Sequence, residues 1–200
     1  MRHKIVGRKN KTIVMLASCL FSIILTGCGI KSYDTNILQF SKDGSITEYM
    51  VEEFDESLYD ATELKGELTA QIDEYNSSNE KDKVVLGDYE LKDGVLKCSV
   101  TYPSDNAYFD LNNTPLFYGT IAQAVKAGYS LLTPVNSVET GELLESGALQ
   151  KLDAHIVILN IPTDVNTCKN ITYISKGVTV GDDHKMATVS GEGTAYIVFE

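Results

Sequence analysis

The chain has 200 residues, with 28 acidic and 17 basic side chains, a formal charge of −11 at pH 7, and four cysteines. Residues 1–27 hold five of the basic residues and no acidic one, so the remainder has 12 lysines, no arginine and a formal charge of −16. Recognition of phosphate groups depends on arginine and lysine clusters, so this composition argues against nucleic acid and other anionic partners.

The N-terminus has a basic opening, an apolar run over 13–25, and then Leu25-Thr26-Gly27-Cys28. This layout is typical of a secretory signal. A transmembrane helix is one alternative, although 13 residues fall short of the roughly 20 that span a bilayer. An ordinary secretory signal with a coincidental cysteine is the other.

The tetrapeptide resembles the lipobox of bacterial lipoproteins. The resemblance implies cleavage between Gly27 and Cys28 and a diacylglycerol thioether on Cys28. Two acyl chains give stable attachment to a membrane. We therefore expect a signal peptide over 1–27 and a lipid-anchored protein on the extracytoplasmic face of the cell membrane.

Residues 28–36 are short and polar, and we expect them to form a tether reaching at most about 27 Å. The folded domain is predicted to span 37–200. Strands over 37–40 and 45–54 flank Lys42-Asp43-Gly44, and Asp-Gly between apolar runs is a strong signal for a hairpin. The acidic residues at 52, 53, 55 and 56 indicate a solvated strand end.

A helix is predicted over 61–76. Asp60 is a good N-cap, Glu63 completes a capping-box pattern, and Tyr59 and Leu64 have the spacing of a hydrophobic staple. Apolar residues at 61, 64, 68, 72 and 75 form one stripe, which needs a sheet to cover.

A second hairpin follows, with strands over 84–91 and 95–102 around the turn at 92–94. In its second strand, apolar residues alternate with polar ones, which is typical of a strand buried on one face. The apolar set is Leu96, Cys98, Val100 and Tyr102. The sequence therefore predicts a hairpin–helix–hairpin part over 37–128.

The middle of the chain is less regular. We expect an irregular stretch over 104–113 that could include one helical turn, a strand over 114–118 and a helix over 120–127 that ends at Gly128. Residues 129–153 show weak patterning and are predicted to run over the surface.

The C-terminal part, 154–200, is predicted to be rich in strands. Segments 155–159 and 195–199 are apolar at successive positions, which indicates central strands covered on both faces. Shorter strands are expected over 171–174, 178–180 and 187–189. The predicted fold is α+β, with a mostly antiparallel sheet of hairpins, one main helix and one short helix.

Cys98 and Cys168 remain after the signal and the anchor are set aside. Outside the cytoplasm they could form one disulfide, which would stabilise the domain by roughly 4 kcal/mol. The alternative is that Cys98 is a buried free thiol, a common small hydrophobic group. Both alternatives stay open at this point.

No motif for catalysis, cofactor or metal binding is found. His155 and His184 lie near acidic residues but lack the spacing of a zinc motif or a calcium loop. No nucleophile elbow and no phosphate-binding glycine loop is present. Tyrosines could line a binding groove, although ordinary packing also explains them; those in or near loops are Tyr59, Tyr102, Tyr108, Tyr118 and Tyr129.

The mature chain resembles small lipoproteins of Gram-positive anaerobes, for which we know of no activity to carry over. The resemblance lies at 51–55, 74–76, 117–120, 127–129 and 195–198. The predicted anchor, the short tether and the absence of a catalytic motif lead us to expect a non-catalytic domain that binds an envelope protein or cell-wall component. A small-ligand or peptide receptor for a transporter, and an envelope enzyme with dispersed catalytic residues, are the alternatives. A pocket with convergent polar groups would favour either of these.

Overall fold

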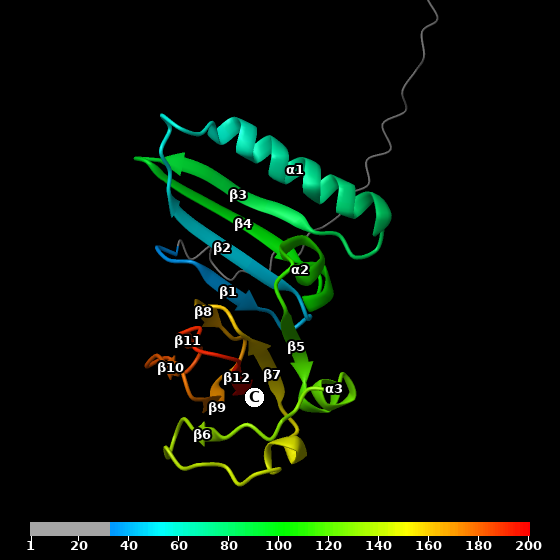
Figure 1. Cartoon of the computed structure of the whole chain (residues 1–200), viewed down its shortest axis with the longest axis vertical. Helices are drawn as coiled ribbons and strands as arrows, with labels where there is room; N and C mark the ends of the chain where they lie inside the picture. Colours follow the sequence, from blue (N-terminus) through cyan, green and yellow to red (C-terminus); the bar gives the residue numbers. More distant parts are fainter. Residues whose placement is uncertain (1–32) are drawn as a thin grey trace, which may run out of the picture. The chain divides into compact units, whose positions relative to one another are not determined.

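Both predicted hairpins are present in the computed structural model, which describes residues 33–200 (Figure 1). In the first, β1 (Ile37–Phe40) pairs antiparallel with β2 (Ile46–Glu53). In the second, β3 (Val85–Lys92) pairs antiparallel with β4 (Val95–Tyr102). The second turn has Asp93 at φ 53° and Gly94 at φ 75°, and a tight hairpin with two left-handed residues favours this pair.

The strands of residues 33–200 form two sheets, which confirms the α+β class. Sheet A has the order β10-β11-β8-β1-β2-β4-β3, and sheet B has the order β5-β7-β12-β9-β6. The further strands of sheet A are β8 (Thr163–Asn166), β10 (Val178–Val180) and β11 (Met186–Val189). Those of sheet B are β5 (Leu116–Thr120), β6 (Val135–Ser137), β7 (His155–Leu159), β9 (Ile171–Ser175) and β12 (Ala195–Phe199).

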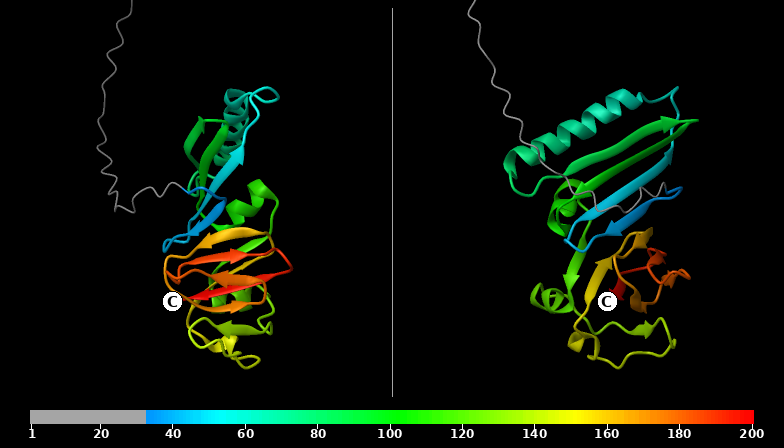
Figure 2. Two further views of the ribbon diagram at one scale, coloured as in Figure 1. Left: turned by 90° about the vertical axis from the view of Figure 1, so that its left-hand side faces the viewer. Right: turned by 180° about the vertical axis from the view of Figure 1, so that it is seen from behind.

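The main helix is α1 (Ala61–Ser78), which begins as predicted. The Asp60 carboxylate accepts hydrogen bonds from the backbone N–H groups of Thr62 and Glu63, at 2.7 and 3.2 Å. The predicted staple between Tyr59 and Leu64 stays a prediction; the two side chains are 66% and 40% exposed, and the Tyr59 ring packs against Phe54 with 6.2 Å between ring centroids. Figure 2 shows α1 running along the β3 end of sheet A.

Two shorter helices follow. The predicted irregular stretch over 104–113 is largely helix α2 (Asp105–Asn112), capped by the Ser104 hydroxyl. Helix α3 (Ile121–Lys126) lies within the predicted range and has a complete capping box between Thr120 and Gln123. A single 3₁₀ turn covers Leu149–Lys151.

The two predicted parts of the chain are not separate sheets. Strand β8, which we did not predict, pairs parallel with β1 and antiparallel with β11, so β8, β10 and β11 extend sheet A. Strands β5 and β6, from the middle of the chain, join sheet B. The predicted parts over 37–128 and 154–200 therefore each contribute strands to both sheets, and residues 33–200 form one compact unit.

Sheet B is buried on both faces, as the apolar runs predicted. Ile197 and Phe199 of β12 belong to the core cluster shared with sheet A. Their neighbours Tyr196 and Val198 belong to a second cluster with Ile121 of α3. That second cluster also takes in three residues from 129–153, namely Leu131, Val135 and Leu149, so the predicted surface segment in fact supplies core side chains.

The segment just before β1 is bound to sheet A. Lys97 donates to the Tyr33 carbonyl oxygen at 3.1 Å and pairs with Asp34 at 2.8 Å. The Tyr33 ring packs edge-on against Tyr49, with 4.9 Å between ring centroids. Asn36 accepts a bond from the Val51 N–H at 2.7 Å. Residues 33–36 of the predicted tether are thus part of the folded unit.

Within this folded unit, no helix combines the length and apolar character needed to cross a bilayer. The predicted signal peptide, the Gly27–Cys28 cleavage site and the lipidation site Cys28 lie outside the described residues.

Candidate functional site

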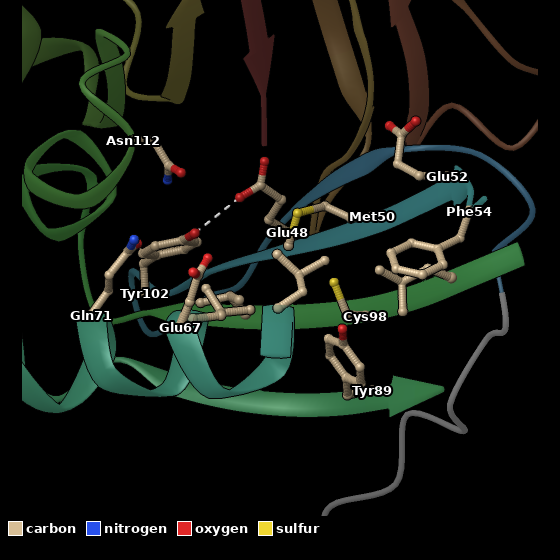
Figure 3. A pocket seen from close by; sticks show the side chains of 14 residues that line it. Glu48, Met50, Glu52, Phe54, Glu67, Gln71, Tyr89, Cys98, Tyr102 and Asn112 are labelled. Atoms are coloured by element: carbon tan, nitrogen blue, oxygen red, sulfur yellow. Dashed lines mark hydrogen bonds between the residues drawn. The ribbon is translucent and has the colours of Figure 1, made fainter. Parts of the chain in front are cut away.

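A groove of about 340 Å³ lies between α1 and sheet A, and we call it the α1 groove (Figure 3). Its floor comes from β2 and β4, its wall from α1, and one end from α2. It is lined by Glu48, Met50, Glu52, Phe54, Leu64, Glu67, Leu68, Gln71, Tyr89, Leu96, Cys98, Val100, Tyr102 and Asn112.

The alternation of β-strands explains the floor. Glu48, Met50 and Glu52 point to one face of β2, because successive side chains of a strand point to opposite faces. On β4 their paired positions are Val100, Cys98 and Leu96. The floor is therefore a strip of apolar side chains with a carboxylate at two points along one side.

The groove exists because α1 covers the sheet incompletely. Ile72, at 4% exposure, is the one buried residue of α1, and the helix contacts β3 and α2. Leu64 and Leu68 of the predicted stripe reach the groove instead of filling a closed core. The inner face of β2 is left partly open to solvent at Glu48, Met50 and Glu52, while the paired side chains of β4 are buried.

Glu48 is the most unusual side chain in the groove. The Tyr102 hydroxyl donates a hydrogen bond to its carboxylate at 3.0 Å, and Tyr108 of α2 donates another. Burial raises the pKa of Glu48, and the two tyrosine hydrogen bonds oppose this by favouring the charged form. An ionised carboxylate offers about four acceptor positions, so two remain for a ligand.

The cysteines are not bridged. Both Cys98 and Cys168 are free thiols, so the disulfide that we considered is corrected in favour of the alternative. Burial, with a smaller effect from the Glu48 charge, raises the pKa of Cys98 to about 11. Since the thiolate is the nucleophilic form, Cys98 is chemically inert near neutral pH and acts as an apolar part of the groove.

Some of the tyrosines named in the sequence analysis line the groove, and others are explained by ordinary packing. Tyr102, and Tyr89 from β3, line the α1 groove. Tyr108 is buried beside Tyr102, with 5.0 Å between ring centroids. Tyr118 packs against Phe40 in the core, and Tyr59 is exposed. Tyr102 and Tyr89 therefore border a groove, while packing explains Tyr118.

Ring packing accounts for the position of His155, and a turn accounts for that of His184. The His155 ring stacks on Phe199, with 5.7 Å between centroids, and His184 is in the β10–β11 turn with φ 53°. His184 also borders a second, more polar hollow of about 460 Å³, together with Glu139 and Glu200. In residues 33–200, no three His, Cys, Asp or Glu side chains are grouped so that they could hold a metal ion.

Glu48 was missed at the sequence level. We treated the acidic residues near the end of the strand as solvated, and did not single out the one near its start. The signal was available in the alternation, since Ile46, Glu48 and Met50 have the same phase. A carboxylate on the apolar face of a strand is costly unless it is hydrogen-bonded.

Comparison of the chain with protein-family models, with curated proteins and with solved structures finds no match. The chemistry of the α1 groove must therefore be argued from its own residues.

Proposed function

We propose that this chain is a lipid-anchored, non-catalytic binding protein on the outer face of the cell membrane, and that its ligand occupies the α1 groove. The groove is the observation that carries the proposal. Its volume of about 340 Å³ is in the range of ligand sites, which are mostly apolar with a few polar groups that orient the ligand. Among the alternatives from the sequence, this favours a receptor for a small ligand or peptide.

The groove has the composition of a binding site. Its apolar floor supplies contact area, and Glu48 supplies one fixed polar anchor held by Tyr102 and Tyr108. The thiol that it contains, Cys98, is protonated near neutral pH because its pKa is about 11. Binding without covalent chemistry is therefore the function that we assign to it.

The anchor belongs to the same proposal. It rests on the basic opening, the apolar run and Leu25-Thr26-Gly27-Cys28. Since residues 33–36 bind sheet A, only 29–32 separate the proposed lipid from the folded unit, and their fully extended reach is about 17 Å. The N-terminal end of the folded unit would then be tethered within that distance of the lipid.

The anchor is tested by metabolic labelling of the full chain with an alkyne fatty acid. We expect label on the wild type and on the control Cys168→Ser, and none on Cys28→Ser. The anchor proposal would be wrong if Cys28→Ser stayed quantitatively in the membrane fraction at its full unprocessed mass.

The groove is tested by photo-crosslinking on intact cells. A benzophenone amino acid replaces Leu64, which lines the groove, or Ala70, which is exposed on α1 and outside the groove lining. We expect a specific adduct from position 64 alone, and its loss when Met50→Trp fills the groove. Val51→Trp, whose side chain points to the opposite face of β2, is the matched control and should leave the adduct unchanged. Identical adducts at positions 64 and 70, or none at either, would contradict the proposal.

A further inference from the structure

The α1 groove is elongated along the sheet. Its lining follows β2 from Glu48 to Glu52 and continues to Phe54, just after β2, and it follows the neighbouring strand β4 from Tyr102 to Leu96. Six residues of extended strand cover about 20 Å. A ligand that uses this whole length must be long and narrow rather than compact.

The charges along the groove have one sign. Within its described lining, the ionisable carboxylates are Glu48, Glu52 and Glu67, and no lysine or histidine is present. Glu48 lies at the α2 end, where the Tyr102 hydroxyl donates a hydrogen bond to its carboxylate. Complementarity therefore calls for a cationic ligand, as does the formal charge of −16 on the chain after residue 27.

The order of the side chains adds a pattern to this charge. Along β2 the groove presents an acid at Glu48, an apolar side chain at Met50 and an acid at Glu52, and Phe54, just after the strand, adds a second apolar side chain. These positions are two residues apart. An extended peptide also presents every second side chain to the same side, at about the same interval.

We propose that the ligand of the α1 groove is an extended peptide segment in which basic and apolar side chains alternate at every second position. A Lys or Arg side chain pairs with Glu48, and the next inward-facing residue is apolar and packs on Met50. This inference rests on the proposed function of the groove and adds the chemical class of its ligand. The polar residues Gln71 and Asn112 also line the groove.

The test is calorimetric titration of the full chain in phosphatidylcholine nanodiscs, with empty nanodiscs as background. The probe is Lys-Ser-Leu-Ser-Lys-Ser-Leu-Ser-Lys, which has the required spacing in both directions. One control has the same composition in the order Lys-Lys-Lys-Ser-Ser-Ser-Ser-Leu-Leu, and a second has Glu in place of Lys. We expect the first peptide to bind at least about tenfold more tightly than either control, because only it matches both charge and spacing.

The matched variants are Glu48→Gln and Glu53→Gln, two identical changes on β2. Glu53 is exposed and is not part of the groove lining. We expect Glu48→Gln to weaken binding of the probe about tenfold or more, and Glu53→Gln to leave it unchanged. As a second variant, Glu52→Gln, at the exposed second acidic position of the groove, should weaken binding severalfold.

The outcomes separate this inference from the function on which it rests. Equal binding of the three peptides, or equal effects of Glu48→Gln and Glu53→Gln, would overturn the peptide inference. So would a non-peptide adduct at position 64 that Met50→Trp abolishes, although that result would still support the groove as a binding site. If wild-type cells gave no adduct at position 64 and the probe peptide did not bind, both the peptide inference and the proposed function would be overturned.

Discussion

Removing the last six residues, 195–200, should unfold the protein, because β12 is the central strand of sheet B. Ile197, Val198 and Phe199 are each 0% exposed. Burying a side chain of this size stabilises a fold by about 1.5–3 kcal/mol, so these three contribute about 5–9 kcal/mol. The deletion also removes the pairing of β12 with β7 and β9. Domains are stable by about 5–15 kcal/mol in total, so the loss consumes most or all of the stability.

The assay is urea unfolding of the full chain in a mild detergent, followed by the near-UV circular dichroism of its tyrosines. We expect no cooperative transition for the truncated chain. Glu200→Ala is the control, since this residue is exposed and lies after β12, and its free energy of unfolding should stay within about 0.5 kcal/mol of wild type. A truncated chain with an unchanged transition would refute the reasoning.

Two substitutions and one chemical modification test the roles assigned to particular residues. Asp60→Ala removes the N-cap of α1 and should lower the free energy of unfolding by about 1 kcal/mol in urea titration, whereas Asp60→Asn should retain most of it. Burial raises the pKa of Glu48, so the folded state holds its proton more tightly than the unfolded state, and stability falls as the pH rises through that pKa. Glu48→Gln should therefore be more stable than wild type at pH 7 and show a flatter pH dependence in the same titration; a less stable variant would contradict this. Cys168, which is partly exposed, should react with iodoacetamide before buried Cys98 under non-reducing conditions, and a peptide linking the two in mass spectrometry would contradict their free state.

Local patterns were sufficient to predict the hairpins and the start of α1. The turns at 42–44 and 92–94 each place Asp-Gly between apolar runs, and such turns depend on neighbouring residues alone. Asp60 likewise satisfies backbone groups within its own first turn. The central position of β7 and β12 also followed from the sequence, because only strands covered on both faces remain apolar at successive positions.

Pairing between distant segments could not be read from the sequence. Strand β8 is Thr-Asp-Val-Asn, with one buried side chain, Val165, and its partners β1 and β11 are set by tertiary contacts. The stretch 129–153 has no period, because its core residues Leu131 and Leu149 are single anchors in irregular backbone. Neither segment carries a local signal that distinguishes it from a surface loop.

The candidate site was predictable only in part. Tyr102 is among the tyrosines that the sequence suggested could line a groove. The alternation of apolar residues in β4 placed Cys98 on the same face of the strand. The stripe on α1 predicted that the helix would cover the sheet, but no pattern shows how far it extends over β2. That distance decides whether Glu48 is simply buried or faces a groove.

The most direct test of the α1 groove as the binding site uses its methionine. Residues 33–200 contain two, Met50 in the groove and Met186 in β11, outside the groove lining. The measurement is methyl NMR of the full chain, ¹³C-labelled at methionine, during titration with the alternating basic peptide in nanodiscs. We predict a saturable shift of the Met50 methyl signal while that of Met186 stays in place. Binding that leaves Met50 unmoved, or that shifts both signals alike, would contradict the account.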